Sequence, residues 1–154
     1  MNAEFINPFL VSLINVISTM ATIDLIPGKP QIKNHDLAKG DVSGLIGMIG
    51  PKTKGSLSIT FEQKLILEVM HNMLGEKPEY VNDDVTDLVG EITNIVTGGA
   101  KNLLSDKGYD FEMATPAVVS GKNHTISHKA QGKKILMPFS HAHGNAYIEI
   151  CFED

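Results

Sequence analysis

The chain contains one long amphipathic segment, Asn82-Asp-Asp-Val-Thr-Asp-Leu-Val-Gly-Glu-Ile-Thr-Asn-Ile-Val-Thr-Gly-Gly-Ala-Lys-Asn-Leu-Leu104. At about 100° per residue, its apolar side chains cluster on one side of a helix: Val85, Leu88, Val89, Ile92, Val96, Ala100 and Leu103. Such a cluster is typical of a helix whose apolar face packs against a protein core. Asp83 and Asp84 suit the N-terminal end of a helix, and Lys107 and Gly108 supply stop signals. The segment is therefore predicted to be a long helix.

The opposite side of this predicted helix carries a polar stripe. Its members are four, three and four positions apart: Asp87, Glu91, Asn94 and Gly98. This spacing stacks them on the solvent side of the helix. Glutamate and asparagine on an exposed face are often only solubilising residues. However, the consecutive Gly98 and Gly99 each cost a helix about 1 kcal/mol relative to alanine, which favours a close approach by another molecule. Spacing alone leaves a solvated face and a binding site as alternatives.

The segments around this helix predict several strands and two more helices. The apolar segment Phe5–Ile26 is punctuated by polar residues at helical intervals and follows no basic region, so we predict an amphipathic helix rather than a membrane anchor. Alternation and turn signals predict an edge strand at Gln31–Asn34, a hairpin of Val42–Gly50 with Ser56–Phe61, a helix at Glu62–Leu74, a strand at Pro116–Ser120, and a hairpin of Ile135–Ser140 with Ala146–Phe152. We therefore expect an α+β fold, an antiparallel β-sheet with long helices packed on one face.

The first and the third predicted helices resemble each other weakly. Val11–Thr19 aligns with Gly90–Gly98, which places Asn15 opposite Asn94 and Ser12 opposite Glu91. Both helices are followed later by a predicted hairpin. Because amphipathic helices also resemble one another by chance, duplication and coincidence are equal alternatives at this point.

Composition restricts the class of protein. The 154 residues are 42% hydrophobic and 20% charged, which is ordinary for a soluble globular protein, and we expect a single domain over residues 1–154. The net charge of −5 and the lack of a basic cluster beyond Lys133 and Lys134 argue against a nucleic-acid surface. The single cysteine, Cys151, is expected to be buried in a strand. Since no secretory signal pattern is visible, a reducing, cytoplasmic location is expected.

The six histidines do not have the spacing of a metal site. His141 and His143 are expected in an exposed hairpin turn, and His124 and His128 in a solvated loop. No cysteine or carboxylate lies at ligand spacing from them. We therefore expect no metal-binding residues and no cofactor site.

The stripe itself resembles a known signature. The pattern Asp87-x-x-x-Glu91-x-x-Asn94-x-x-x-Gly98-x-Ala100 is similar to that of the CheC/CheX/FliY phosphatases of bacterial chemotaxis. The single copy of the pattern, the short chain and the opening Glu4-Phe-Ile-Asn-Pro-Phe-Leu10 resemble the CheX branch in particular. The resemblance covers nearly the whole chain in the order of its elements.

This resemblance implies a reaction and roles for the stripe. Members of the family hydrolyse the aspartyl phosphate of CheY-like response regulators, and the regulator supplies the phosphoryl group, its Mg²⁺ and a lysine, so no further cofactor is implied. By resemblance, the carboxamide of Asn94 orients the attacking water, and Glu91 pairs with the regulator's lysine. Gly98 matches the position of close approach. Asp87 either contacts the partner or only stiffens the helix.

The resemblance also implies one active site and a homodimer. Ser12 stands where two-site members carry their first glutamate, so a second site is not expected. The CheX branch dimerises by joining sheet edges, which would cover the apolar first helix and the strand Val42–Gly50. A non-catalytic dimeric module that binds a regulator or a motor component is the alternative, and a purely structural dimer is a third. The sequence names neither the regulator nor the pathway.

Overall fold

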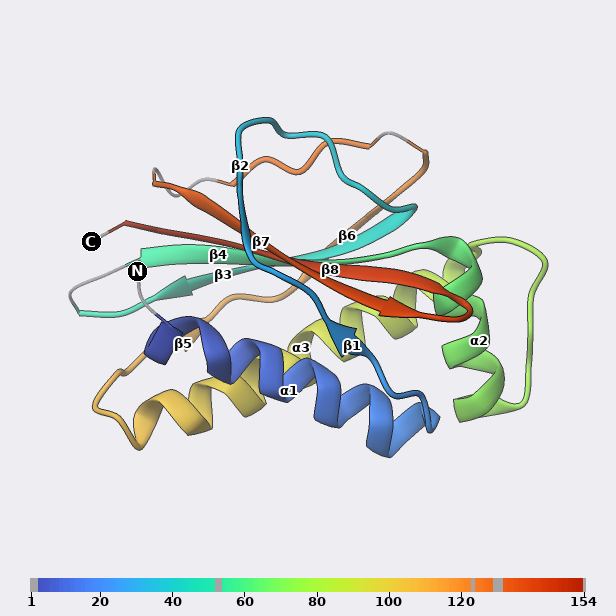
Figure 1. Cartoon of the computed structure of the whole chain (residues 1–154), viewed down its shortest axis with the longest axis horizontal. Helices are drawn as coiled ribbons and strands as arrows, with labels where there is room; N and C mark the ends of the chain where they lie inside the picture. The colour runs from blue at the N-terminus through green and yellow to red at the C-terminus, as the bar shows by residue number, and fades with distance from the viewer. Residues whose placement is uncertain (1–2, 52–53, 123, 129–131, 154) are drawn as a thin grey trace.

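The protein is an antiparallel sheet with helices on one face, and its computed structural model describes residues 3–51, 54–122, 124–128 and 132–153 (Figure 1). The helices within these residues are α1 (Ala3–Ala21), α2 (Gln63–Leu74) and α3 (Asp83–Ser105). The eight strands of the sheet are β1 (Ile26–Pro27), β2 (Gln31–Lys33), β3 (Val42–Ile49), β4 (Lys54–Phe61), β5 (Glu112–Met113), β6 (Ala117–Ser120), β7 (Lys134–His141) and β8 (Gly144–Glu153). The predicted α+β fold is confirmed.

The sheet is built from two hairpins that meet in its centre. Its order is β1-β7-β8-β4-β3-β5, with β2 also paired to β7 and β6 also paired to β3. Each half of the chain contains a long helix, two short strands and a hairpin, with α2 as an additional helix between the halves. The short strands of each half pair with the hairpin of the other half. This exchange is the same in both directions, which favours duplication over coincidence as the origin of the helix resemblance.

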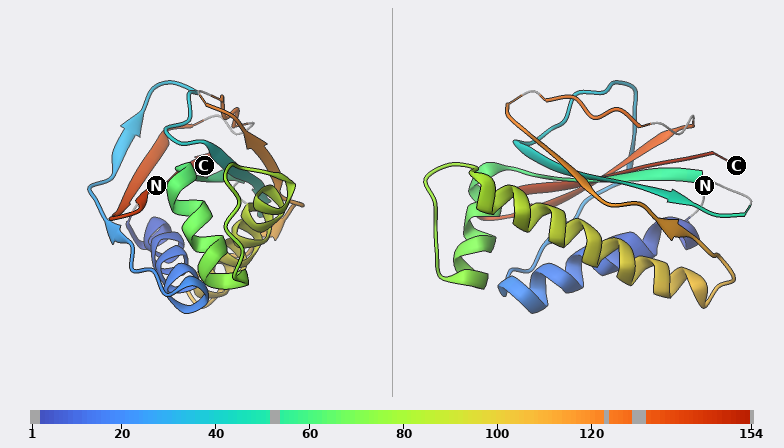
Figure 2. Two further views of the ribbon diagram at one scale, coloured as in Figure 1. Left: turned by 90° about the vertical axis from the view of Figure 1, so that its right-hand side faces the viewer. Right: turned by 180° about the vertical axis from the view of Figure 1, so that it is seen from behind.

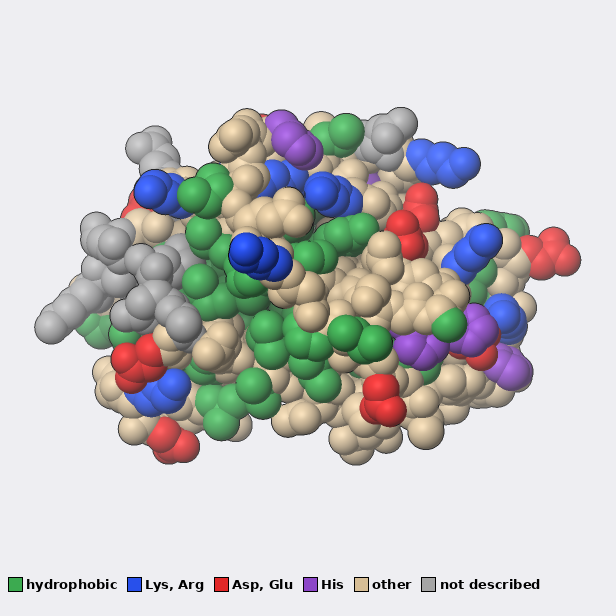
Figure 3. Space-filling model, in the orientation of Figure 1, with side chains coloured by type: hydrophobic (Ala, Val, Ile, Leu, Met, Phe, Trp, Pro, Cys, Tyr) green, Lys and Arg blue, Asp and Glu red, His purple; other side chains and the backbone are tan. Residues whose placement is uncertain are grey.

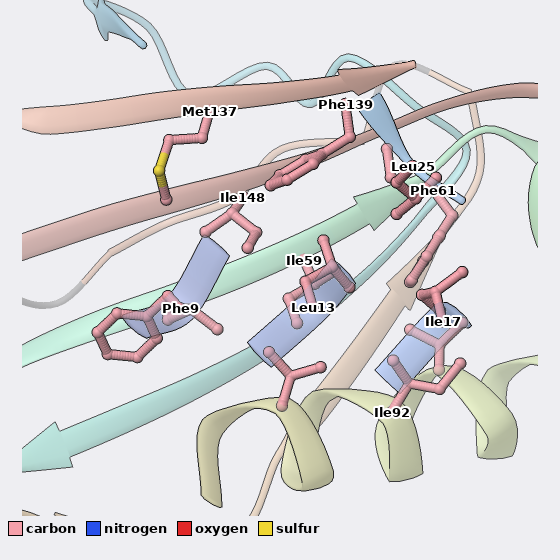
Figure 4. Packing of buried hydrophobic residues seen from close by; sticks show 14 of the residues in the cluster. Phe9, Leu13, Ile17, Leu25, Ile59, Phe61, Ile92, Met137, Phe139 and Ile148 are labelled. Atoms are coloured by element: carbon pink, nitrogen blue, oxygen red, sulfur yellow. The ribbon is translucent and has the colours of Figure 1, made fainter. Parts of the chain in front are cut away.

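The two long helices lie side by side against one face of the sheet (Figure 2). The apolar face of α1 and that of α3 meet side chains from β4, β7 and β8 in one core, and Figure 4 shows Leu13, Ile17 and Ile92 between the helices and the strands. Each of these three side chains is at most 1% exposed. By length and composition, the stretch Glu4–Ala21 could also cross a membrane. Its apolar side chains instead fill this core, as the predicted amphipathic helix required.

The opposite face of the sheet buries several polar side chains and is covered by segments without helices (Figure 1). Lys33 Nζ lies 2.6 Å from the Glu149 carboxylate, and neither side chain is more than 2% exposed. His128 contacts the same carboxylate and also lies 2.5 Å from Ser56 Oγ. Burial raises the pKa of Glu149, but hydrogen bonds from His128 and Lys33 outweigh it, so the net pKa lies below its ordinary value. This face is therefore held together by charge and hydrogen bonds.

Two predictions about this region were wrong. His124 and His128 are buried rather than solvated, because residues 124–128 lie over the sheet, where His124 Nε2 lies 2.6 Å from Ser43 Oγ. The strand Val42–Gly50 does not need a second subunit to cover it, because β5 and β6 pair with the outer edge of β3. The local pattern predicts β6 as a strand but does not show that it pairs with β3, and β5 is too short, at two residues, to give a pattern of its own.

Candidate functional site

α3 is a well-defined helix of 23 residues that carries the polar stripe. The side chain of Asn82 accepts a hydrogen bond of 3.0 Å from the backbone N–H of Val85, so Asn82 is the N-cap, and Asp83 and Asp84 lie in the first turn, at the N-terminal end that they were expected to suit. The chain turns away after Ser105, and Gly108 adopts a φ of 91°, which suits glycine. Firm ends and a buried face make α3 a rigid support for side chains on its outer side.

The structure places all four stripe residues on the outer side of α3. Asp87, Glu91 and Asn94 are exposed, and Gly98 is half-buried. Among the described residues, no hydrogen bond or ion pair engages the side chains of Glu91 or Asn94. A carboxylate and a carboxamide one turn apart are therefore both available to another molecule.

The two adjacent glycines of α3 have different surroundings. A Cβ atom on Gly98 would meet nothing within 4 Å, which leaves open space beside Asn94. A Cβ atom on Gly99 would lie 2.6 Å from the Oγ of Ser12 in α1. Only Gly98 can therefore serve an approaching partner, and the expectation that both glycines form one smooth patch was wrong because α1 already occupies the space at Gly99.

The aligned positions in α1 do not repeat the stripe. Asn15 is exposed like Asn94, but Ser12 is only 5% exposed, and its Oγ donates a hydrogen bond of 2.7 Å to the backbone carbonyl of Val96. The position that would hold a second carboxylate thus holds a small residue turned inward. This arrangement supports a single site, on α3.

The stripe lies on a helix surface rather than in a cavity. A cavity of about 610 Å³ is lined by β3, β4 and the segment around β5, and none of its lining residues belongs to α3. Enzymes that act on small molecules usually enclose them in a concave pocket. A projecting Asn94 fits the reverse case, in which a macromolecular partner supplies the pocket.

The charge around the stripe is unevenly distributed. Four carboxylates occupy the N-terminal half of α3, from Asp83, Asp84, Asp87 and Glu91, whereas Lys101 lies in the C-terminal half. A partner with a basic group near its binding pocket is therefore favoured at the Glu91 end.

Histidines and other ligand types do not gather near the stripe. Over the described ranges, no group of three or more His, Cys, Asp or Glu side chains is arranged to hold a metal ion. The rings of His141 and His143 stack with their centroids 5.4 Å apart at the turn between β7 and β8, where the predicted hairpin turn lies.

Comparisons with known proteins agree on one family. The family described as "Chemotaxis phosphatase CheX" matches residues 42–140. A crystal structure of a CheC-like superfamily protein from Shewanella sp. PV-4 is 73% identical, covers 100% of both chains and has a TM-score of 0.95. The CheX–CheY–BeF3–Mg²⁺ complex from Borrelia burgdorferi contains a chain that is 27% identical, with 97% of this chain and 98% of that chain covered and a TM-score of 0.81. The CheY-P phosphatase CheX of Thermotoga maritima is 27% identical over 141 residues, which are 91% of this chain and 89% of the relative.

The family match is long and includes the site. It runs from the start of β3 almost to the end of β7, so it contains the whole of α3 and both Glu91 and Asn94. It also spans more than half of the 154 residues. The resemblance that the sequence suggested is confirmed: this chain belongs to the chemotaxis phosphatase CheX family.

Proposed function

We propose that this protein hydrolyses the aspartyl phosphate of a CheY-like response regulator. The observation that carries the proposal is the pair Glu91 and Asn94, exposed one turn apart on a rigid helix. Two relatives support it, one named as a CheY-P phosphatase and one crystallised with CheY, BeF3 and Mg²⁺. A phosphatase of this kind has no need of its own metal, since the bound regulator brings Mg²⁺ with it.

The proposed role of Asn94 is to orient the attacking water. Its carboxamide oxygen accepts a hydrogen bond from the water, and its NH₂ group donates one to a neighbouring oxygen. The water oxygen then attacks phosphorus in line with the aspartyl oxygen, the bond from phosphorus to that oxygen breaks, and inorganic phosphate and a free aspartate result. An amide suits this role, because holding the water in line with the phosphorus–oxygen bond lowers the barrier even though Asn94 does not accept a proton.

The proposed role of Glu91 is to dock the regulator. Its exposed carboxylate, one turn before Asn94, pairs with the lysine that lies beside the regulator's phosphoryl group and sets the register of binding. Gly98 leaves room for the partner's backbone, as the open space at its Cβ position indicates. Asp87 extends the same stripe toward the partner.

We also propose that the protein is a cytoplasmic homodimer formed at a sheet edge. Hydrophobic side chains gather over α1 and the edge strands β1 and β2 in Figure 3. Ile26 and Ile32 on these strands are 64% and 61% exposed. Exposed apolar side chains on an edge with unpaired backbone groups are typical of a surface that pairs with a second chain.

The test is the decay of a phosphorylated CheY-type receiver in the presence of Mg²⁺. Wild-type protein, Glu91→Ala and Asn94→Ala are compared, and the binding of each to the receiver is measured in parallel. We expect wild type to accelerate decay, Asn94→Ala to bind without turnover, and Glu91→Ala to bind weakly. Unchanged decay with a receiver that wild type binds would instead identify a non-catalytic docking module.

A further inference from the structure

The Oγ of Ser12 makes two close contacts between α1 and α3, in addition to the apolar packing of the two helices. This oxygen donates a 2.7 Å hydrogen bond to the carbonyl of Val96, two residues beyond Asn94. A Cβ atom added at Gly99 would lie 2.6 Å from the same oxygen, closer than nonbonded atoms approach, so either the Ser12 hydroxyl turns away and gives up this hydrogen bond or the helices move apart. Both contacts bear on how closely α3 sits beside α1.

The other flank of α3 is locked against the sheet. A Cβ on Gly44 of β3 would lie 1.9 Å from Oγ1 of Thr93, the residue directly before Asn94. Thr93 is fully buried, and its Oγ1 donates a 2.7 Å hydrogen bond to the carbonyl of Val89. Asn94 therefore projects from a turn of helix that is fitted closely on both buried sides.

A docked regulator must touch more than α3. A helix of 23 residues is about 34 Å long and roughly 10 Å wide, so its outer face offers about 340 Å², whereas a standard interface covers about 800 Å² on each partner. The neighbouring outer surface is α1, where Val11 is 42% exposed beside Ser12. A regulator that contacts both helices would be sensitive to the depth of α3 relative to α1, because this depth sets how far Asn94 reaches into the partner.

We propose that Ser12 and Gly99 are positioning residues of the phosphatase reaction, which set the depth of Asn94 through the contact between α1 and α3. This inference rests on the proposed function. Ser12 is buried in the contact between the helices, so its effect on the reaction passes through α3, whose Val96 carbonyl it binds. A displacement of about 1 Å in a reacting geometry can cost about 100-fold in rate.

The test is a double-mutant cycle on Ser12 and Gly99, because the Ser12 Oγ makes both the hydrogen bond and the close approach. Ser12→Ala removes the hydrogen bond, Gly99→Ala introduces the clash, and the double variant removes the atom against which the new methyl clashes. Thr97→Val is the matched control, since Thr97 is equally buried but bonds only within its own helix, to the carbonyl of Thr93. For each variant, kcat and KM for the phosphorylated receiver and the Tm are measured.

We expect kcat to fall about tenfold in Ser12→Ala and about 100-fold in Gly99→Ala, with KM within about threefold of wild type. The double variant should recover to the level of Ser12→Ala, and Thr97→Val should keep its kcat. If Ser12→Ala and the double variant lower only Tm, the contact is structural and the inference is wrong. The proposed function has a separate failure, in which wild type itself does not accelerate decay.

Discussion

α1 and α3 are similar helices that pack alike but carry different residues on their outer sides. Both cover the same face of the sheet, and at aligned positions both bury an apolar residue, Leu13 with Ile92 and Ile17 with Val96, each at most 1% exposed. On the outer side they differ, because α3 displays Glu91 where α1 turns Ser12 inward. The buried positions are thus alike in the two helices. They differ at one aligned position, where α3 has the exposed Glu91 of the candidate site and α1 has the buried Ser12.

The two halves of the chain also differ at paired positions of the central strands β4 and β8. Ser58 of β4 lies directly opposite Glu149 of β8. Ser58 Oγ is buried without a hydrogen-bond partner among the described residues, whereas Glu149 joins Lys33 and His128. At this pair of aligned positions, the second half therefore supplies the carboxylate and the first half a hydroxyl.

The largest expected effect separates the two exposed asparagines. Asn94→Ala should lower turnover at saturating phosphorylated receiver by about 100- to 1,000-fold, the usual loss when one positioned hydrogen-bonding group is removed from an active site. Asn15→Ala should lower it by less than about threefold, since α1 lacks the neighbouring carboxylate. Single-turnover phosphate release measures both variants. Equal losses would mean that α1 also carries an active site.

The next largest effect concerns the buried ion pair of Lys33 and Glu149. Glu149→Gln should lower the free energy of unfolding by about 1–3 kcal/mol, because the buried Lys33 loses its counter-ion. Chemical denaturation at neutral pH measures this loss.

The same glutamate gives the stability a pH dependence of known sign. Because the pKa of Glu149 lies below its ordinary 4.5, the unfolded state binds more protons in that range, so this contribution is present above about pH 4.5 and is lost as pH falls through the folded pKa. In Glu149→Gln the acid dependence should be weaker. Glu68→Gln is the comparison, because a hydrogen bond from Lys77 also lowers the pKa of Glu68, but the Lys77 side chain is half-exposed, so the change in acid dependence should be smaller there. An unchanged acid profile would rule out this role of Glu149.

A smaller effect is expected when the carboxylate of Glu91, which has no counterpart on α1, is removed. Glu91→Ala should raise the Kd for the phosphorylated receiver about tenfold, equivalent to about 1.4 kcal/mol, and should weaken the dependence of binding on salt. Titration calorimetry at two ionic strengths measures both. The parallel variant Asp87→Ala decides between partner contact and helix stiffening, because only a partner contact changes Kd.

The smallest effect concerns the two glycines. Gly98→Ala should stabilise the fold by up to about 1 kcal/mol, since the position is open and alanine favours a helix, while regulator binding weakens. A thermal melt and a binding titration of the same sample measure the two. Tighter binding together with higher Tm would contradict a close approach at Gly98.

Local patterns along the chain were sufficient for much of the site. The helical period placed Glu91 and Asn94 outward, and both hairpins were found near their observed bounds. The histidine loop was misread, because burial of His124 and His128 depends on a segment returning over the sheet from far along the chain. Polar residues in a loop look alike whether the loop faces water or a sheet.

Spacing, charge and apolar periodicity thus specified the helices, the hairpins and the outward stripe, since each depends on residues a few positions apart. Only the packed molecule decided that Ser12 binds the carbonyl of Val96, that Gly99 and Gly44 make room for side chains from other elements, and that Lys33 meets Glu149. These contacts join residues separated by dozens of positions. Their geometry depends on how whole elements pack, which no local pattern encodes.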